Sequence, residues 1–160
     1  MKNSNNPIAA LILGAAFSFC LTACSKAVVS GTVEGAPDTR LVASRLVSNR
    51  YESIDTLTTD ALGAFKFRVD VAAGDPEFVY LQKDGRNIAS YLLFPGDRVK
   101  TNVSADGVVT VTGSDESALM NEIDRDYAAF VKSMEASPSA KTYVDYYRSR
   151  VSYIFNHLTS

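Results

Sequence analysis

Residues 28–113 consist of eight short apolar segments separated by turn signals, and this pattern constrains the fold more than any other feature of the chain. The clearest segment is 64–71, AFKFRVDV, in which apolar and charged residues alternate. Alternation with a period of two places the apolar set on one face of a half-buried strand. We therefore predict strands at eight ranges: 28–35, 40–47, 52–60, 64–71, 77–82, 87–94, 98–103 and 108–113.

Turn-forming residues interrupt these segments at short intervals, as at 60–63 (DALG), 84–85 (DG), 95–97 (PGD) and 106–107 (DG). Glycine, proline and aspartate dominate tight turns because each suits the backbone angles that such turns require. No helical segment lies between the strands, which argues against the strand–helix alternation of a parallel sheet. The sequence therefore predicts a mainly β protein, with an antiparallel β-sandwich of about eight short strands over 28–113.

The apolar period changes from that of a strand to that of a helix after Gly113. A helix is predicted at about 115–135, with Ser114 or Asp115 as its N-cap. Its apolar side chains form a stripe of the ordinary width for a helix that lies on a core. The stripe consists of Leu119, Met120, Ile123, Tyr127, Phe130, Val131 and Met134.

A second helix is predicted at about 139–158, after the break at Ser137–Pro138. Together with the first it forms a C-terminal helical segment, 114–160. Its apolar and aromatic residues spread around more of the helix than one small sandwich can cover. Either its tyrosines are partly exposed, or the helix contacts another domain or chain. The segment ends without a glycine or proline stop signal, so we expect a chain that is truncated relative to a longer protein.

An uncharged stretch of fourteen residues, 8–21, follows Lys2 near the N-terminus. Crossing a bilayer takes about twenty apolar residues, so this stretch better fits the apolar region of a secretory signal. The residues that end it, Leu21-Thr22-Ala23-Cys24, resemble the lipobox of bacterial lipoproteins. The resemblance implies cleavage between Ala23 and Cys24. It also implies a diacylglycerol on the Cys24 sulfur, and usually a third acyl chain on the new amine.

The only other cysteine, Cys20, has the wrong spacing from Cys24 for a Cys-x-x-Cys redox motif. One acyl chain anchors a protein only marginally, whereas two or three chains give a stable anchor. We therefore predict a signal peptide at 1–23 and a lipidated N-terminus with a short tether at 24–27. The predicted location is the cell envelope, with the protein lipid-anchored to the outer membrane and facing the periplasm.

Charge and residue types narrow the function classes. The chain has 16 basic and 18 acidic residues, which gives no strong basic field for nucleic acid. The sole histidine, His157, excludes His-based triads and multi-histidine metal sites, and we assign it a structural place near a helix C-terminus. Glu122, Asp124 and Asp126 follow one another at intervals of two, and residues two apart on a helix face different ways, so the three do not converge and we interpret them as a solvated face. We predict no catalytic residue, no cofactor and no metal site.

Five segments in this order match a known pattern: VSGTVEG (29–35), DTLTTDALGAFKF (55–67), FVYLQKDG (78–85), LLFPGDRVKTNV (92–103) and VVTVTGSDES (108–117). Together they resemble an N-terminal domain of unknown function in lipoproteins of Gram-negative bacteria. That domain commonly precedes a thioredoxin-like domain of the TlpA/ResA type. The resemblance implies a β-sandwich followed by helices, and thiol–disulfide exchange for the full-length relatives. No redox site carries over, because no cysteine follows Cys24.

These observations favour a non-catalytic, membrane-tethered lipoprotein module. We expect it to be an accessory or docking domain for a thioredoxin-like thiol–disulfide oxidoreductase that packs on the C-terminal helix. One alternative is that the chain is the N-terminal fragment of a full oxidoreductase. Another is an envelope module that binds peptide or glycan.

Overall fold

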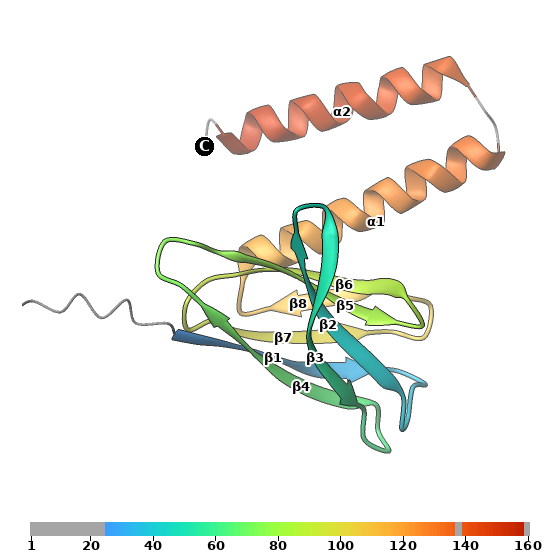
Figure 1. Ribbon diagram of the computed structural model, residues 1–160. Coiled ribbons are helices and arrows are strands. Elements are labelled where there is room, and N and C mark those ends of the chain that lie inside the picture. The colour runs from blue at the N-terminus through green and yellow to red at the C-terminus, as the bar shows by residue number, and fades with distance from the viewer. Residues whose placement is uncertain (1–24, 137–138, 159–160) are drawn as a thin grey trace, which may run out of the picture.

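The computed structural model describes residues 25–136 and 139–158, which form a two-sheet β-sandwich followed by two helices (Figure 1). This architecture confirms the predicted mainly β fold, and each element lies within a few residues of its predicted range. The elements are β1 (Ser25–Val33), β2 (Arg40–Val47), β3 (Arg50–Thr58), β4 (Ala64–Val71), β5 (Glu77–Lys83), β6 (Arg86–Leu93), β7 (Arg98–Val103), β8 (Val109–Thr112), α1 (Asp115–Ala136) and α2 (Ala140–Leu158).

The two sheets have the strand orders β4-β1-β7-β8 and β3-β2-β5-β6. Five of the six strand pairings are antiparallel, as predicted, but β1 and β7 run parallel. Hairpin turns force neighbouring strands to be antiparallel. Because β1 and β7 are far apart in the sequence, no hairpin sets their relative direction, and the local pattern could not reveal this pairing.

The hydrophobic core lies between the sheets. In β4 the apolar residues are buried and the charged residues are exposed, which confirms the predicted alternation. The ring of Phe67, from β4, makes a T-shaped contact with Tyr91, from β6, at 6.2 Å between ring centroids. The two sheets therefore share one core, whose fully buried large side chains include Val29, Leu41, Val79, Leu81, Leu93 and Val99.

β1 begins at Ser25, inside the range that the sequence assigns to a tether. The prediction of a tether is therefore wrong for 25–27. Ser25 pairs with Val71 and Ala27 pairs with Val69 across the antiparallel β1–β4 ladder, and Ala27 is fully buried. The segment lacks the large alternating apolar residues that mark a strand, but the small Ala27 side chain fits between the sheets. The predicted signal peptide at 1–23, Ala23 and Cys24 lie outside the described residues.

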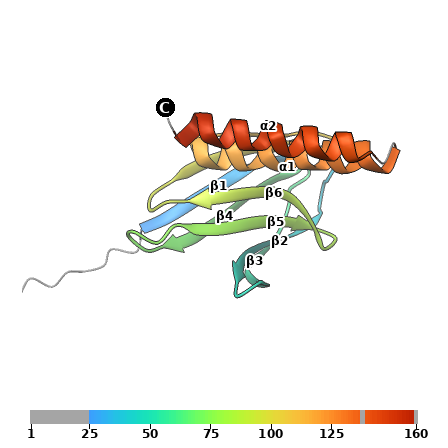
Figure 2. The same cartoon turned by 90° about the horizontal axis from the view of Figure 1, so that it is seen from above.

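α1 lies along one open side of the sandwich, where it contacts β6 and β8, an edge strand of each sheet (Figures 1 and 2). The expectation that its apolar stripe covers the core is wrong. The two buried residues of α1 are polar, Ser117 and Asn121, whereas Tyr127 in the stripe is exposed and its other members are only partly buried. The physical reason is that α1 covers a strand edge, and the unpaired backbone groups of an edge need polar partners.

α2 packs against α1 and lies on the side of α1 that faces away from the sandwich (Figures 1 and 2). The two helices run in opposite directions, so the C-terminal end of α2 returns toward the end of the sandwich where β1 begins (Figure 1). Among the described residues, no helix is both long enough and apolar enough to cross a membrane.

Candidate functional site

Two side chains of α1 hydrogen-bond the outer edge of β6. Ser117 Oγ accepts a bond from the Leu92 N–H at 3.2 Å and donates one to the Leu92 carbonyl at 3.0 Å. Asn121 Oδ1 accepts a bond from the Ser90 N–H at 3.1 Å, and its Nδ2 donates one to the Ser90 carbonyl at 2.6 Å. These are the bonds that a neighbouring strand would make, so α1 closes the edge of this sheet.

The start of α1 is fixed by Ser114, one of the two predicted N-caps. The Ser117 N–H donates to Ser114 Oγ at 3.1 Å, which is the bond expected from an N-cap side chain. The capped first turn places Ser117 opposite Leu92, and Asn121 follows one turn later opposite Ser90. The cap therefore sets the register between the helix and the strand edge.

Two acidic residues of α1, Asp124 and Asp126, make polar contacts that the sequence does not predict. Ser90 Oγ donates to Asp124 Oδ2 at 2.6 Å, and Asp126 Oδ2 lies 3.6 Å from a guanidinium nitrogen of Arg150 in α2. Glu122, Asp124 and Asp126 are all exposed, which confirms the interpretation of a solvated face, although Asp124 and Asp126 also have these polar partners. No group of three or more acidic, histidine or cysteine residues within the part of the chain that the structure describes could hold a metal ion.

The Asn121→Ala variant should lose about 2 kcal/mol of unfolding free energy, because it leaves the buried N–H and carbonyl of Ser90 without their partners on α1. Urea denaturation measures the loss. Glu122→Ala is the matched control, since Glu122 is the exposed neighbour on the same helix and should change stability by less than about 0.5 kcal/mol. Equal midpoints for the two variants would show that α1 does not cap β6.

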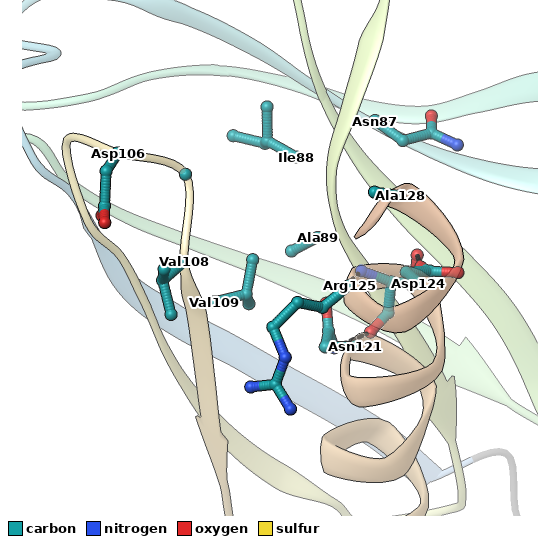
Figure 3. A pocket seen from close by; sticks show the side chains of 12 residues that line it. Asn87, Ile88, Ala89, Asp106, Val108, Val109, Asn121, Asp124, Arg125 and Ala128 are labelled. Carbon is teal, nitrogen blue, oxygen red and sulfur yellow. Dashed lines mark hydrogen bonds between the residues drawn. The ribbon is translucent and has the colours of Figure 1, made fainter. Parts of the chain in front are cut away.

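Beyond Asp124, α1 separates from the two sheet edges and leaves a half-open cavity of about 310 Å³ (Figure 3). Its walls come from 87–90 in β6, from 106–109 around the β7–β8 connection and from α1. The Arg125 side chain reaches from α1 into this space (Figure 3). Ile88, Val108 and Val109 give it an apolar side, so the cavity combines one cation with apolar and carboxylate walls.

The charges at the cavity are mixed. The hydrogen bond from Ser104 Oγ holds the pKa of Asp106 below its usual value. The Arg125 Nε lies 4.0 Å from an Asp126 oxygen, and the Arg125 side chain is mostly exposed. The cavity lining contains no histidine, cysteine or lysine. Ser90 and Asp124, which both line the cavity, hydrogen-bond each other, and the rest of the lining combines apolar and polar side chains with one guanidinium, which is the composition of a small polar binding site.

A polar and aromatic network covers the outer face of the sheet that contains β2, β3 and β5. Tyr51 and Tyr80 make an edge contact at 5.3 Å between centroids, and Asn87 Nδ2 donates to the Tyr51 hydroxyl at 3.0 Å. Gln82 Nε2 donates to Asn87 Oδ1 at 2.9 Å. Burial, followed by the nearby Tyr51 and Asp124, raises the pKa of Tyr80. These polar groups bond to one another, which favours a structural role for the network.

An aromatic cluster joins α1 to α2. The rings of Phe130 and Tyr146 stack at 4.0 Å between centroids, with 11° between their planes. Arg150 supports the contact from α2, because it pairs with Asp126 and its guanidinium carbon lies 6.0 Å from the centroid of the Tyr146 ring. The rings of Tyr143 and Tyr147 also contact Phe130. The two helices are therefore held together by aromatic packing and one ion pair.

Next to this aromatic cluster, α2 carries apolar side chains that are about half exposed or more. They are Tyr143, Val144, Tyr147 and Val151, which we call the α2 surface. Tyr147 is 45% exposed and Val151 is 66% exposed. Of the two expectations for this helix, partial exposure of its tyrosines is confirmed, while contact with another domain or chain stays a prediction. The His157 side chain lies outside the described residues.

No known protein family matches this chain, and no curated protein matches it. The resemblance to the lipoprotein domain that precedes thioredoxin-like domains therefore stays a prediction, based on the five sequence segments that carry it.

Proposed function

We propose that this protein is a non-catalytic, membrane-tethered lipoprotein module that serves as a docking domain for a thioredoxin-like thiol–disulfide oxidoreductase. The observation that carries the docking role is the exposed part of the apolar α2 surface. The thioredoxin-like nature of the partner is inferred from the sequence resemblance over residues 28 to about 130. The lipid tether is inferred from the lipobox-like residues Leu21-Thr22-Ala23-Cys24.

The α2 surface has the composition of a protein interface. Exposed apolar residues that lie together on a helix commonly mark an interaction site, and tyrosine is enriched in such sites. The core between the sheets does not depend on α2, whose main packing partner is α1. Stabilisation of the sandwich therefore does not explain why Val144 and Val151 are apolar. A partner that covers these two residues would explain it.

The chain by itself is unsuited to thiol–disulfide exchange. Exchange requires a thiolate that attacks a disulfide, and residues 25–160 contain no cysteine. A docking module holds its partner at the membrane, and the partner carries out the redox chemistry. This division fits the α2 surface, which offers contact area without a thiol.

Site-specific photo-crosslinking tests the docking role. A photoreactive phenylalanine analogue replaces Tyr147 in the envelope-located protein, and mass spectrometry identifies the crosslinked product. The expected product is a protein or domain with a thioredoxin-like sequence and a Cys-x-x-Cys motif. The same analogue at Lys66, exposed on β4, is the control and should give no such product. A partner without that motif, or the same product from both positions, would contradict the proposal.

The Cys24→Ala variant should lose membrane retention completely, because the acceptor sulfur for the lipid is removed. Fractionation of the full-length protein into soluble and membrane portions measures the loss. Cys20→Ala is the matched control, since Cys20 belongs to the predicted signal and should be dispensable for anchoring. A Cys24→Ala protein that stays with the membrane would refute the lipid anchor.

A second candidate function is favoured by the same α2 surface. In it, a thioredoxin-like domain follows in the same polypeptide and covers Tyr147 and Val151 from within the chain. The chain would then be the N-terminal part of a full oxidoreductase. The coding sequence beyond Ser160 distinguishes the two, because a Cys-x-x-Cys motif within a thioredoxin-like pattern favours this candidate and an immediate stop codon excludes it.

A further inference from the structure

We propose that the end of the sandwich at which β1 begins rests directly on the lipid surface, with the loop that contains Phe94 in contact with the headgroups. This inference rests on the proposed function, because it takes Cys24 as the lipid attachment point. It adds a defined orientation of the sandwich relative to the membrane and a second membrane contact besides the lipid. A lipid tether alone requires neither.

The argument begins with the length of the link between lipid and fold. Ser25 follows Cys24 in the sequence and is already the first residue of β1. A trans peptide bond separates the Cα atoms of neighbouring residues by about 3.8 Å, so the attachment point lies within one residue of the sheet. Ser25 is held there by its pairing with Val71. A flexible linker that would let the sandwich stand away from the membrane is therefore absent between Cys24 and β1.

Two loops lie beside Ser25 at this end of the sandwich (Figure 1). The β4–β5 connection, 72–76, follows Val71 directly, and Val71 pairs with Ser25. The β6–β7 connection, 94–97, is equally close, since a Cβ added at Gly96 would lie 3.6 Å from Ser25 Oγ. Its last residue, Asp97, accepts a hydrogen bond from the Val28 N–H at 2.8 Å. Anchoring at Cys24 therefore brings both loops to the membrane together.

The composition of these two loops suits the headgroup region. Apart from Asp75, the exposed residues of these two connections are small or apolar: Ala72, Ala73, Gly74, Phe94, Pro95 and Gly96. Near this end, Lys26 of β1 and Asp70 of β4 pair with each other at 3.4 Å. The exposed carboxylate of Asp75 favours a shallow position among the headgroups over burial among acyl chains.

Phe94 is an exposed aromatic residue at this end that can contact the membrane. Its side chain is 38% exposed, and its backbone is fixed by two hydrogen bonds with Asp97. The Phe94 N–H donates to Asp97 Oδ2 at 3.0 Å, and the Asp97 N–H donates to the Phe94 carbonyl at 3.2 Å. Apolar side chains at the headgroup boundary add to the membrane affinity of a lipid anchor. The loop therefore presents a preorganised apolar contact next to the attachment point.

The opposite end of the sandwich provides a matched reference position. Leu62 is 84% exposed in the turn between β3 and β4. That turn is tied to the far end of β1 by a hydrogen bond from the Val33 N–H to the Gly63 carbonyl at 2.9 Å. The nine residues of β1 span roughly 26 Å at about 3.3 Å per residue. Leu62 therefore lies well outside the lipid contact expected for Phe94.

Fluorescence quenching tests the inference, because the chain contains no tryptophan and each variant adds a single fluorophore. Phe94→Trp and Leu62→Trp are made in the full chain, produced in a Gram-negative host and purified with the lipid attached. Each is reconstituted into phosphatidylethanolamine–phosphatidylglycerol vesicles whose acyl chains are brominated close to the headgroups. We expect loss of emission for Phe94→Trp, relative to vesicles without bromine, and unchanged emission for Leu62→Trp.

The outcomes separate this inference from the proposed function. The intact mass of each purified protein first establishes whether Cys24 carries the lipid. If it does, an unquenched Phe94→Trp variant, or equal quenching of both variants, overturns the membrane contact and leaves the anchor standing. If Cys24 is unmodified, the anchor fails, and this inference fails with it.

Discussion

The Phe67→Asp variant is expected to be unfolded at neutral pH. Phe67 is 2% exposed and lies between the sheets, where its ring contacts Tyr91. Removing a large buried aromatic side chain costs about 3–5 kcal/mol, and burying an unpaired carboxylate adds to this loss. The sum is comparable with the total stability of an ordinary domain, about 5–15 kcal/mol. Circular dichroism and urea denaturation measure the effect.

A pH series isolates the charge of the new side chain. Burial would raise the pKa of the aspartate in the folded state above its unfolded value, so protonation favours the fold. The charge-dependent part of the loss is therefore largest above the folded-state pKa and disappears below the unfolded-state pKa. Lys66→Asp places the same side chain on the exposed face of β4 and should keep the wild-type fold. Unaltered stability of Phe67→Asp would show that β4 presents its other face to the core.

The Gly31→Ala variant is expected to lose about 3 kcal/mol or more of unfolding free energy. A Cβ at Gly31 would lie 1.8 Å from the Thr101 carbonyl oxygen and 2.7 Å from its carbon. Both are backbone atoms, so no side-chain rotation relieves the contact. Gly31 and Thr101 are partners in the parallel β1–β7 pairing, and β1 and β7 are the two central strands of their sheet. The strands would have to separate in the middle of that sheet.

Ser30→Ala is the control for this position. Ser30 precedes Gly31 in β1, pairs with Lys66 on one side and Lys100 on the other, and is only partly buried. Its replacement should change the free energy of unfolding by less than about 0.5 kcal/mol. Urea midpoints that coincide for Gly31→Ala and Ser30→Ala would mean that β1 and β7 do not approach each other closely at Thr101.

The sandwich was predictable from the sequence because each strand has a recognisable pattern within its own residues. In β4 every second residue is apolar, and turn residues such as Gly63 and the Asp84–Gly85 pair stand between the strands. The parallel pairing of β1 with β7 was not predictable in this way. It depends on contacts between segments far apart in the chain, which alternation within one segment does not encode. The start of β1 was missed because Ser25–Ala27 carries no large apolar residue.

The face of α1 that packs on the edge of β6 was not predicted, for a different reason. Apolar periodicity singles out Leu119, Ile123 and Phe130, but the helix meets a strand edge through polar side chains. Ser117, Asn121 and Asp124 are spaced by four and three residues, so they share one face of the helix. That polar stripe could have indicated a polar contact surface on the helix. Identifying its partner required knowing that β6 is an edge strand, which only the strand order of the sheet shows.

The cavity beside Arg125 was beyond sequence reasoning, because its walls come from two sheets and a helix that meet only in the folded chain. In contrast, the lipobox-like residues that end at Cys24 can be recognised from a few neighbouring residues, without knowledge of any tertiary contact. The proposed function joins both kinds of inference. The membrane tether is inferred from the sequence, whereas the structure places Ser25 in β1 and leaves apolar side chains of α2 exposed.

The intact mass of the mature protein, extracted from membranes of a Gram-negative host, tests the lipid-tethered account most directly. The account predicts a chain that begins at Cys24, lacks residues 1–23 and carries a diacylglycerol on the cysteine sulfur. A mature chain that still begins at Met1, or one with an unmodified thiol at Cys24, would contradict it.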